Sequence, residues 1–349
     1  MEQIERVCIS PNSICNMNCR YCYFFGDDRS KIYDDKLSSS EIYTILDQIY
    51  KYSMKDLVSK KIKVNFVGSG EPLLSWTEIK SSLEKIYREE KNEKLRFYIV
   101  TNGLLLNKKI ISEMKMLNLS PSISIDGNSK INDKYRRTKS NEGTFNDVIK
   151  KFKILKEEGF DIVINTTVTR FLMKNLGEYF EFLKKYEINK VIFDRLVDVP
   201  KGFPEVSYNE FYNFLEDVNI MQKKTELDYI EIGNLEAFRR GIQKEADKVC
   251  TMFGSCCGAG INNIIYLQRE VYPCGRMFDD KYWKLGEFNE SLHKLQNEML
   301  KKLKETTNIC KNCEIQEICI NDCLLEQIKS DYSCFARKQF IIKMSKELR

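Results

Sequence analysis

Residues 4–23 read IERVCISPNSICNMNCRYCY, and they join a short strand pattern to a loop that carries three cysteines. The stretch Ile4–Ile9 is rich in Val and Ile, which favours a β-strand. Cys15, Cys19 and Cys22 then follow within eight residues, and cysteine thiolates bind zinc or iron–sulfur clusters. A four-iron cluster takes one ligand per iron. The loop therefore either leaves one iron open or shares a closed site with a cysteine from elsewhere.

Similar strand patterns alternate with amphipathic stretches through the first two-thirds of the chain. The predicted strands are Ile4–Ile9, Ile62–Val67, Leu95–Val100, Ser122–Ile125, Asp161–Val168 and Lys190–Leu196. The predicted helices are Ser39–Tyr52, Thr77–Glu90, Asn107–Leu117, Thr144–Glu158 and Asn175–Tyr186. Repeated βα units predict an α/β fold with a parallel sheet, and the pattern alone fits both an open doubly wound sheet and an incomplete barrel. In both folds ligands gather at the carboxyl ends of the strands, where the cysteine loop also lies.

The composition points to metal or redox chemistry. The chain has 349 residues and 13 cysteines, and without a signal sequence we expect a cytoplasmic protein whose clustered thiols bind metal rather than form disulfides. No apolar run approaches the roughly 18 residues of a membrane helix, so we expect no membrane partner. Lysines are interleaved with glutamates at a net charge of +5, which is typical of solvated helix faces and not of a nucleic-acid patch. The one histidine, His293, argues against Cys/His zinc fingers and Ser-His-Asp hydrolysis.

Four motifs at strand ends resemble those of the radical S-adenosylmethionine (SAM) superfamily. CNMNCRYCY at Cys15–Tyr23 is similar to its CxxxCxxC signature. GSGEP at Gly68–Pro72 is similar to its GGEP motif, with Ser69 in place of a glycine. The other two motifs are TNG, which begins at Thr101, and SISIDG, which begins at Ser122. The resemblance extends from Ile4 to Pro200. It implies a partial (β/α)6 TIM-like barrel and a [4Fe-4S] cluster whose open iron binds SAM for cleavage to a 5′-deoxyadenosyl radical. It also implies SAM contacts by Tyr21, Tyr23, Ser69, Gly70, Glu71, Asn102, Ser124 and Asp126, with Arg136 on the SAM carboxylate.

The strand patterns thin out after about Leu227, where nine cysteines appear between Cys250 and Cys334. We therefore predict two domains, residues 1–226 and 227–349. The second resembles the SPASM extension of radical SAM enzymes, which implies two auxiliary [4Fe-4S] clusters. The resemblance implies Cys250, Cys257 (or Cys256), Cys274 and Cys323 as ligands of the first cluster, and Cys310, Cys313, Cys319 and Cys334 as ligands of the second.

Alternatives to these ligand sets stay open. Cys310, Cys313, Cys319 and Cys323 would also make a closed zinc site, and the first auxiliary cluster without Cys250 would keep an iron open for a substrate thiolate. Cys8 is assigned to no cluster, and we expect it to be a small buried apolar residue of the first strand. Arg269 stands where the family usually has a glycine, which concerns a hairpin turn and not ligation.

Enzymes similar to this sequence modify peptides or proteins. We therefore predict a maturase that crosslinks, oxidises or epimerises a ribosomally made peptide, with a flavodoxin- or ferredoxin-type electron donor. Because the chain starts at the first strand, we expect another surface or a separate protein to bind the leader of that peptide. The first alternative is an anaerobic sulfatase-maturating enzyme. Those enzymes have a catalytic aspartate directly after the YPC cysteine, where this chain has Gly275. The second is a non-enzymatic iron–sulfur sensor or scaffold, against which the SAM motifs argue.

Overall fold

The computed structural model describes residues 4–25, 36–55, 60–243, 263–278, 280–304, 313–319, 323 and 334–348. Its strands form one ten-stranded sheet in the order β10-β9-β8-β1-β2-β3-β4-β5-β6-β7. The first six strands are β1 (Arg6–Ser10), β2 (Ile62–Phe66), β3 (Leu95–Thr101), β4 (Leu119–Ser124), β5 (Val163–Val168) and β6 (Lys190–Arg195). All six match predicted strands to within a few residues.

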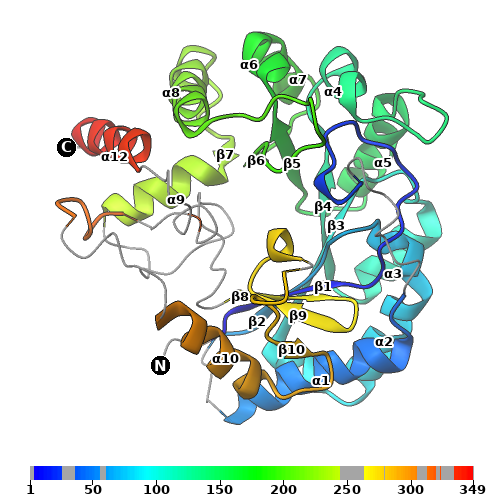
Figure 1. Cartoon of the computed structure of the whole chain (residues 1–349). Helices are drawn as coiled ribbons and strands as arrows, with labels where there is room; N and C mark the ends of the chain where they lie inside the picture. Colours follow the sequence, from blue (N-terminus) through cyan, green and yellow to red (C-terminus); the bar gives the residue numbers. More distant parts are fainter. Residues whose placement is uncertain are drawn as a thin grey trace.

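The strand order decides between the two folds that the sequence pattern allowed. Strands β1 to β6 are parallel, and each one is hydrogen-bonded to the next along the chain. A doubly wound sheet reverses its strand order at a switch point, whereas a barrel adds strands in one direction. The sheet curves with its helices outside (Figure 1), so the predicted partial barrel is confirmed.

Four further strands extend the barrel sheet at both edges. At one edge β7 (Glu231–Ile232) pairs parallel with β6. At the other edge β8 (Asn263–Leu267) pairs parallel with β1. The sheet then continues antiparallel through β9 (Glu270–Tyr272) and β10 (Gly286–Glu287). The sheet thus includes residues on both sides of Leu227, and the domain boundary there stays a prediction.

Helices surround the outer face of the sheet. The five predicted ones are α1 (Ser39–Lys55), α2 (Trp76–Arg88), α3 (Lys108–Met116), α5 (Phe145–Glu157) and α7 (Leu176–Lys185). The others are α4 (Ser129–Tyr135), α6 (Arg170–Lys174), α8 (Tyr208–Lys224), α9 (Gly233–Ile242), α10 (Leu292–Lys304) and α12 (Phe335–Glu347). The C-terminal helix α12 lies against α8 and α9 (Figure 1). Within the described ranges, no helix combines the length and the apolar character that crossing a membrane requires.

Strand β4 begins three residues before its predicted start at Ser122. Pro121 lies inside the strand, paired with Ile99 of β3, although a proline usually marks a strand end or an edge. Its neighbours explain the difference, because Leu119, Pro121 and Ile123 are buried in alternation and so continue the core face of the strand. The prediction gave too much weight to the proline and too little to this period of two.

The start of α8 is held by a charged network that allows a stability test. Ser207 Oγ accepts from the Glu210 amide at 3.3 Å, and the Glu210 carboxylate accepts from the Ser207 amide at 2.9 Å. Arg170 Nε of α6 donates to Glu210 Oε1 at 2.6 Å and, with the Ser207 donors, lowers the pKa of Glu210 to about 2. Because this pKa is depressed in the folded state, the stabilisation is present above the unfolded value near pH 4.5 and is lost as the pH falls toward 2.

We expect Glu210→Gln to lower the free energy of unfolding by about 1–2 kcal/mol at pH 7, since it weakens a cap and an ion pair that is partly exposed. Urea unfolding followed by circular dichroism measures this. The difference from the wild-type protein should shrink at pH 4 and below. Glu181→Gln, at an exposed position of α7, is the matched control and should change stability by less than about 0.5 kcal/mol. A pH-independent loss in Glu210→Gln would contradict the electrostatic origin.

Candidate active site

A cavity of about 460 Å³ opens at the carboxyl ends of the strands. Its lining comes from the loop after β1, from the ends of β2 to β6 and from the turn after β9. Of the predicted SAM and cluster residues, those that line it are Cys15, Cys19, Tyr21, Cys22, Tyr23, Ser69, Gly70, Glu71, Asn102, Ser124 and Arg136. Asp126 lies behind this surface and is 2% exposed. The structure therefore brings together nearly all of the residues that the strand-end motifs single out.

The cysteine loop is clamped between the ends of β2 and α4. On the α4 side, the amides of Asn18 and Arg20 donate to the carbonyls of Arg137 and Tyr135 at 2.8 and 2.9 Å. On the β2 side, the Glu71 amide donates to the carbonyl of Ile14 at 2.7 Å. These bonds fix a loop that has no regular secondary structure of its own, and they hold its thiols at the cavity wall.

The three thiols suit an iron–sulfur cluster in chemistry, and all three line the cavity. Cys15 Sγ accepts from the Met17 amide at 3.4 Å, and burial raises the pKa of this thiol to about 11. Without metal the thiol is protonated at neutral pH, and metal binding would displace the proton. Among the described residues, no three Cys, His, Asp or Glu side chains form a group suited to one metal ion. A cubane cluster instead places each thiolate on a different iron, which separates the thiolates more widely.

Both carboxylate oxygens of Glu71 accept hydrogen bonds from neighbouring residues. Its Oε1 accepts from Thr101 Oγ1 at 2.6 Å and from the Leu73 amide at 3.1 Å, while Oε2 accepts from the Asn102 amide at 2.8 Å. Burial raises the pKa of this carboxyl group, and these donors oppose the rise. Asn102 in turn donates to Asn16 Oδ1 at 2.8 Å. The glutamate thus joins the ends of β2 and β3 to the cysteine loop.

The GSGEP turn leaves no room for side chains at two positions. Gly68 has φ +152°, and a Cβ there would lie 2.2 Å from Ser10 Cβ. A Cβ on Gly70 would lie 2.3 Å from both Asn12 Oδ1 and the Ile14 carbonyl. Ser69, which replaces a glycine of the family motif, has its hydroxyl 3.1 Å from Ser10 Oγ. A serine is therefore accommodated at position 69, whereas the two glycines are required by close approach of the backbone.

Tyr21, Asp126 and Arg136 form a buried charged network. Tyr21 Oη donates to Asp126 Oδ2 at 2.6 Å, and Arg136 Nη1 donates to Tyr21 Oη at 2.8 Å. Asp126 Oδ1 accepts from the Thr167 amide at 3.0 Å and lies 3.9 Å from Arg136 Nη1. Burial raises the pKa of Asp126, and Arg136 opposes that rise. Asp126 thus orients Tyr21 and Arg136, and of the two charged groups only Arg136 reaches the cavity wall.

Sequence reasoning missed residues that support the site from a distance. Gln268, in the β8–β9 turn, has φ +52°, and its Nε2 donates to Ser10 Oγ and Ser69 Oγ at 3.2 Å each. Arg269 follows in the same turn, and its side chain donates to Glu41 at 2.7 Å. The left-handed backbone conformation, which glycine adopts most easily, therefore occurs at Gln268 and not at Arg269. A glutamine in a turn gives no signal for such a contact.

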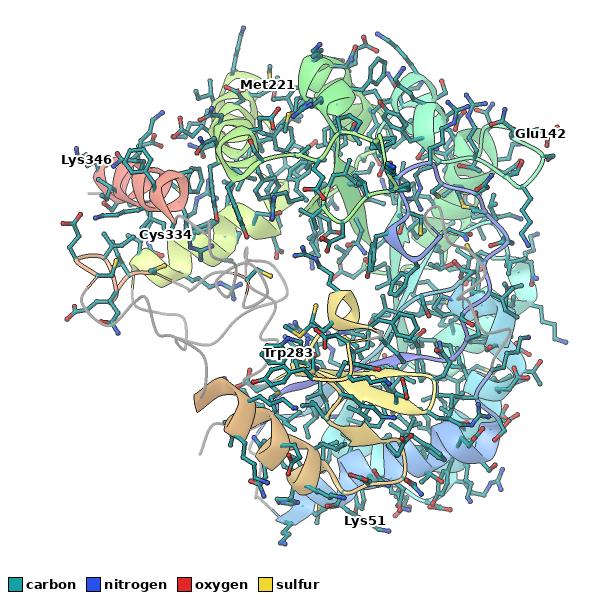
Figure 2. The ribbon with its side chains drawn as sticks, viewed as in Figure 1. Lys51, Glu142, Met221, Trp283, Cys334 and Lys346 are labelled. Atoms are coloured by element: carbon teal, nitrogen blue, oxygen red, sulfur yellow. The ribbon has the colours of Figure 1, made fainter. Side chains whose placement is uncertain are left out.

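The predicted auxiliary ligands are only partly within the described residues. Cys274 precedes η5 (Gly275–Met277), and Cys334 lies where α12 begins (Figure 2). Cys313, Cys319 and Cys323 are described and partly buried. Cys250, Cys256, Cys257 and Cys310 lie outside the described residues. Cys8 is partly buried on β1, and Asn65 Nδ2 donates to its sulfur at 3.9 Å.

Fold and site together define an α/β-barrel protein built to hold a thiolate-bound cofactor at its strand ends. The model of the radical SAM superfamily matches residues 9–183, and the chain belongs to this family. It is 24% identical over 339 residues to a cysteine-type anaerobic sulfatase-maturating enzyme of Clostridium novyi, with 93% of this chain and 88% of that protein covered.

Two solved structures have the same fold. Native anSMEcpe with bound AdoMet and Cp18Cys peptide has a TM-score of 0.79 at 19% identity, covering 98% of this chain and 99% of that one. Streptococcus suis SuiB bound to the precursor peptide SuiA has a TM-score of 0.68 at 17% identity, covering 95% and 74%. The family match makes the chain a radical SAM enzyme, and these structures agree with it in fold. The alternative of a non-enzymatic scaffold finds no support.

The buried network gives a direct test of what holds the cysteine loop. Asp126→Asn leaves the Arg136 cation buried without its carboxylate, so we expect it to cost about 3–5 kcal/mol of folding free energy. Tyr21→Phe removes only hydrogen bonds and should cost about 1–2 kcal/mol. Urea unfolding of the metal-free protein compares the two. Equal costs would show that the carboxylate does not balance the buried cation.

Proposed function

We propose that this radical SAM enzyme is of the SPASM type and modifies a ribosomally made peptide. The proposal rests on one cavity that is lined on one side by the cysteine loop and on another by the segment after a predicted auxiliary ligand. The loop of Cys15, Cys19 and Cys22 forms one wall, and Arg276, two residues after the predicted auxiliary ligand Cys274, contributes to the other. A substrate between them would lie close to both sets of thiols.

Cys15, Cys19 and Cys22 would hold a [4Fe-4S] cluster, which with SAM supplies a 5′-deoxyadenosyl radical. The chain positions and shields this chemistry. Arg136 presents a positive charge at the cavity wall; burial lowers the pKa of Arg136, but the neighbouring Tyr21 and Asp126 outweigh it and keep the guanidinium protonated. A guanidinium suits the SAM carboxylate, because its planar N–H groups match two carboxylate oxygens.

The strand ends complete the proposed SAM pocket. The backbone at Gly70 can approach a ligand closely because no side chain is present there, and Glu71 holds the turn in place. Ser124 and Asn102 add polar side chains at the ends of β4 and β3. The predicted auxiliary clusters would be held by the downstream cysteines, of which Cys274, Cys313, Cys319, Cys323 and Cys334 are described.

The peptide substrate is inferred from the relatives. Two structures of the same fold were solved with a peptide or a precursor peptide bound. Gly275 favours a peptide maturase over a sulfatase maturase, since a general base is absent at that position. A Cβ there would lie 3.5 Å from Tyr23 Oη and Phe24 Cζ, an ordinary contact, so packing does not exclude an aspartate. A flavodoxin- or ferredoxin-type donor would supply the electron for SAM cleavage, and another surface of the chain or a separate protein would bind the leader.

Sulfatase maturation is the second candidate function. The similarity to the cysteine-type sulfatase-maturating enzyme extends over 93% of this chain and 88% of that protein, and so includes the cysteine-rich region. The two candidates share the radical chemistry. They differ in the substrate and in the base that finishes the reaction.

The cluster assignment can be tested by iron content. We expect about twelve irons per reconstituted chain, and the combined change Cys15→Ala, Cys19→Ala and Cys22→Ala should remove about four of them. The same variant should form no 5′-deoxyadenosine from SAM and dithionite under anaerobic conditions, as measured by chromatography. Cys8→Ala is the matched control and should keep both properties. Loss of cleavage with no loss of iron would refute the assignment.

The substrate class can be tested with two peptides. Wild-type enzyme should modify a cysteine-containing precursor peptide encoded beside its gene, detected as a mass change, or as deuterium uptake from heavy water where the product is an epimer. It should leave a sulfatase-derived cysteine peptide without formylglycine, because Gly275 provides no base. Formylglycine made by the wild-type enzyme would favour the second candidate and overturn the first. Gly275→Asp serves as a comparison, since it adds a carboxylate at a position where the Cβ makes only ordinary contacts.

A further inference from the structure

Two arginines donate hydrogen bonds to cysteines of the predicted auxiliary sets. Arg276 Nη1 lies 3.6 Å from Cys323 Sγ, and Arg337 Nε lies 3.5 Å from Cys319 Sγ. Cys323 and Cys319 are predicted ligands of different clusters. We propose that Arg276 and Arg337 raise the reduction potentials of the two auxiliary clusters, one arginine for each, so that they accept electrons from the substrate. This inference rests on the proposed SPASM function.

Arg276 stands between the cavity and the first predicted cluster. It lines the cavity, its side chain is 13% exposed, and its Nε donates to the carboxylate of Asp198, which follows β6. Asp198 has φ +52°, an uncommon backbone conformation for this residue type. The barrel therefore supplies the carboxylate that aims the guanidinium, and the remaining N–H groups of the fork can reach Cys323.

Arg337, in the C-terminal helix, contacts Cys319, a predicted ligand of the second cluster. It lies on α12, three residues after Cys334, and is 2% exposed. Its Nη1 donates to Tyr212 Oη of α8 at 3.0 Å, and its guanidinium carbon lies 5.2 Å from the centre of the Phe238 ring on α9. A metal-bound thiolate at Cys319 would place negative charge beside this buried cation.

The effect on potential follows from charge. Reduction adds one electron to a cluster, and a fixed positive charge with an N–H···S bond stabilises the added charge. The low dielectric of a buried site strengthens the effect. In a crosslink or an oxidation, the peptide radical left after hydrogen abstraction loses one electron and one proton. The electron reduces an oxidised [4Fe-4S]2+ cluster to [4Fe-4S]+, and the proton leaves to water.

The test is a potentiometric titration followed by electron paramagnetic resonance. It uses the full chain, loaded with iron and sulfide, in the background of Cys15→Ala, Cys19→Ala and Cys22→Ala, so that only auxiliary clusters contribute. Arg276→Gln should lower the midpoint potential of one cluster, and Arg337→Gln that of the other. We expect each change to reduce the one-electron reduction constant about tenfold, which equals about 59 mV. Arg276→Lys and Arg337→Lys should recover part of the loss.

Arg239→Gln is the matched control. Arg239 is a half-buried arginine of α9 that donates to Glu236 and Asn219, and its removal should leave both potentials unchanged. Unchanged potentials in Arg276→Gln and Arg337→Gln, with about eight irons retained, would overturn this inference alone. If a Gln variant alone loses about four irons, the Lys variant replaces it: its midpoint potential should lie below that of the unsubstituted arginine, and an unchanged midpoint would overturn the inference. Loss in both would overturn it. A background protein with no auxiliary iron would refute the proposed function as well.

Discussion

The buried cation of Arg136 fixes the relation between the cysteine loop and the barrel. Its guanidinium donates to Tyr21, which belongs to the loop, and Tyr21 donates to Asp126, which follows β4. Backbone bonds from Asn18 and Arg20 to the segment around Arg136 reinforce this arrangement. Holding a loop of this length, without regular structure, in one conformation costs conformational entropy, and the charged network offsets that cost. The charged network selects that conformation, and the position of the three thiols follows from it.

The hairpin of β8 and β9 makes the cysteine-rich part of the chain a structural part of the active site. Strand β8 lies next to β1, parallel to it, and residues Arg6–Ser10 pair with Asn263–Leu267. The turn after β8 then brings Gln268 to the hydroxyls of Ser10 and Ser69. The GSGEP turn is thereby supported from the far end of the sequence. Changes in the hairpin should affect the proposed SAM pocket even though no hairpin residue belongs to its motifs.

Much of the fold followed from local patterns, because strands and helices in a βα repeat are coded by residues close in sequence. The strand-end motifs also predicted the cavity, since parallel strands of one sheet place their carboxyl ends together. What the sequence could not supply was contact between distant segments. The hydrogen bond from Gln268 to Ser69 joins residues that are 199 positions apart, and the one from Arg276 to Cys323 joins residues that are 47 positions apart. Glutamine and arginine are common surface residues, so neither carries a sequence signal for such a role.

Three acids at or behind the cavity wall are held by hydrogen bonds, and Asp194, at the end of β6, also lines the cavity. A general base must be free to take a proton close to the reacting atom. Glu71 accepts hydrogen bonds from Thr101 and Asn102 at the end of β3 and from the Leu73 amide, and Asp126 accepts from Tyr21 and Thr167 behind the wall. Asp198 is engaged by Arg276. These three acids therefore hold structure and orient cations, and they are poorly placed for proton transfer. Under the proposed function the cofactors would supply the bond cleavage, and Arg276 and Arg337 would act where charge changes during electron transfer.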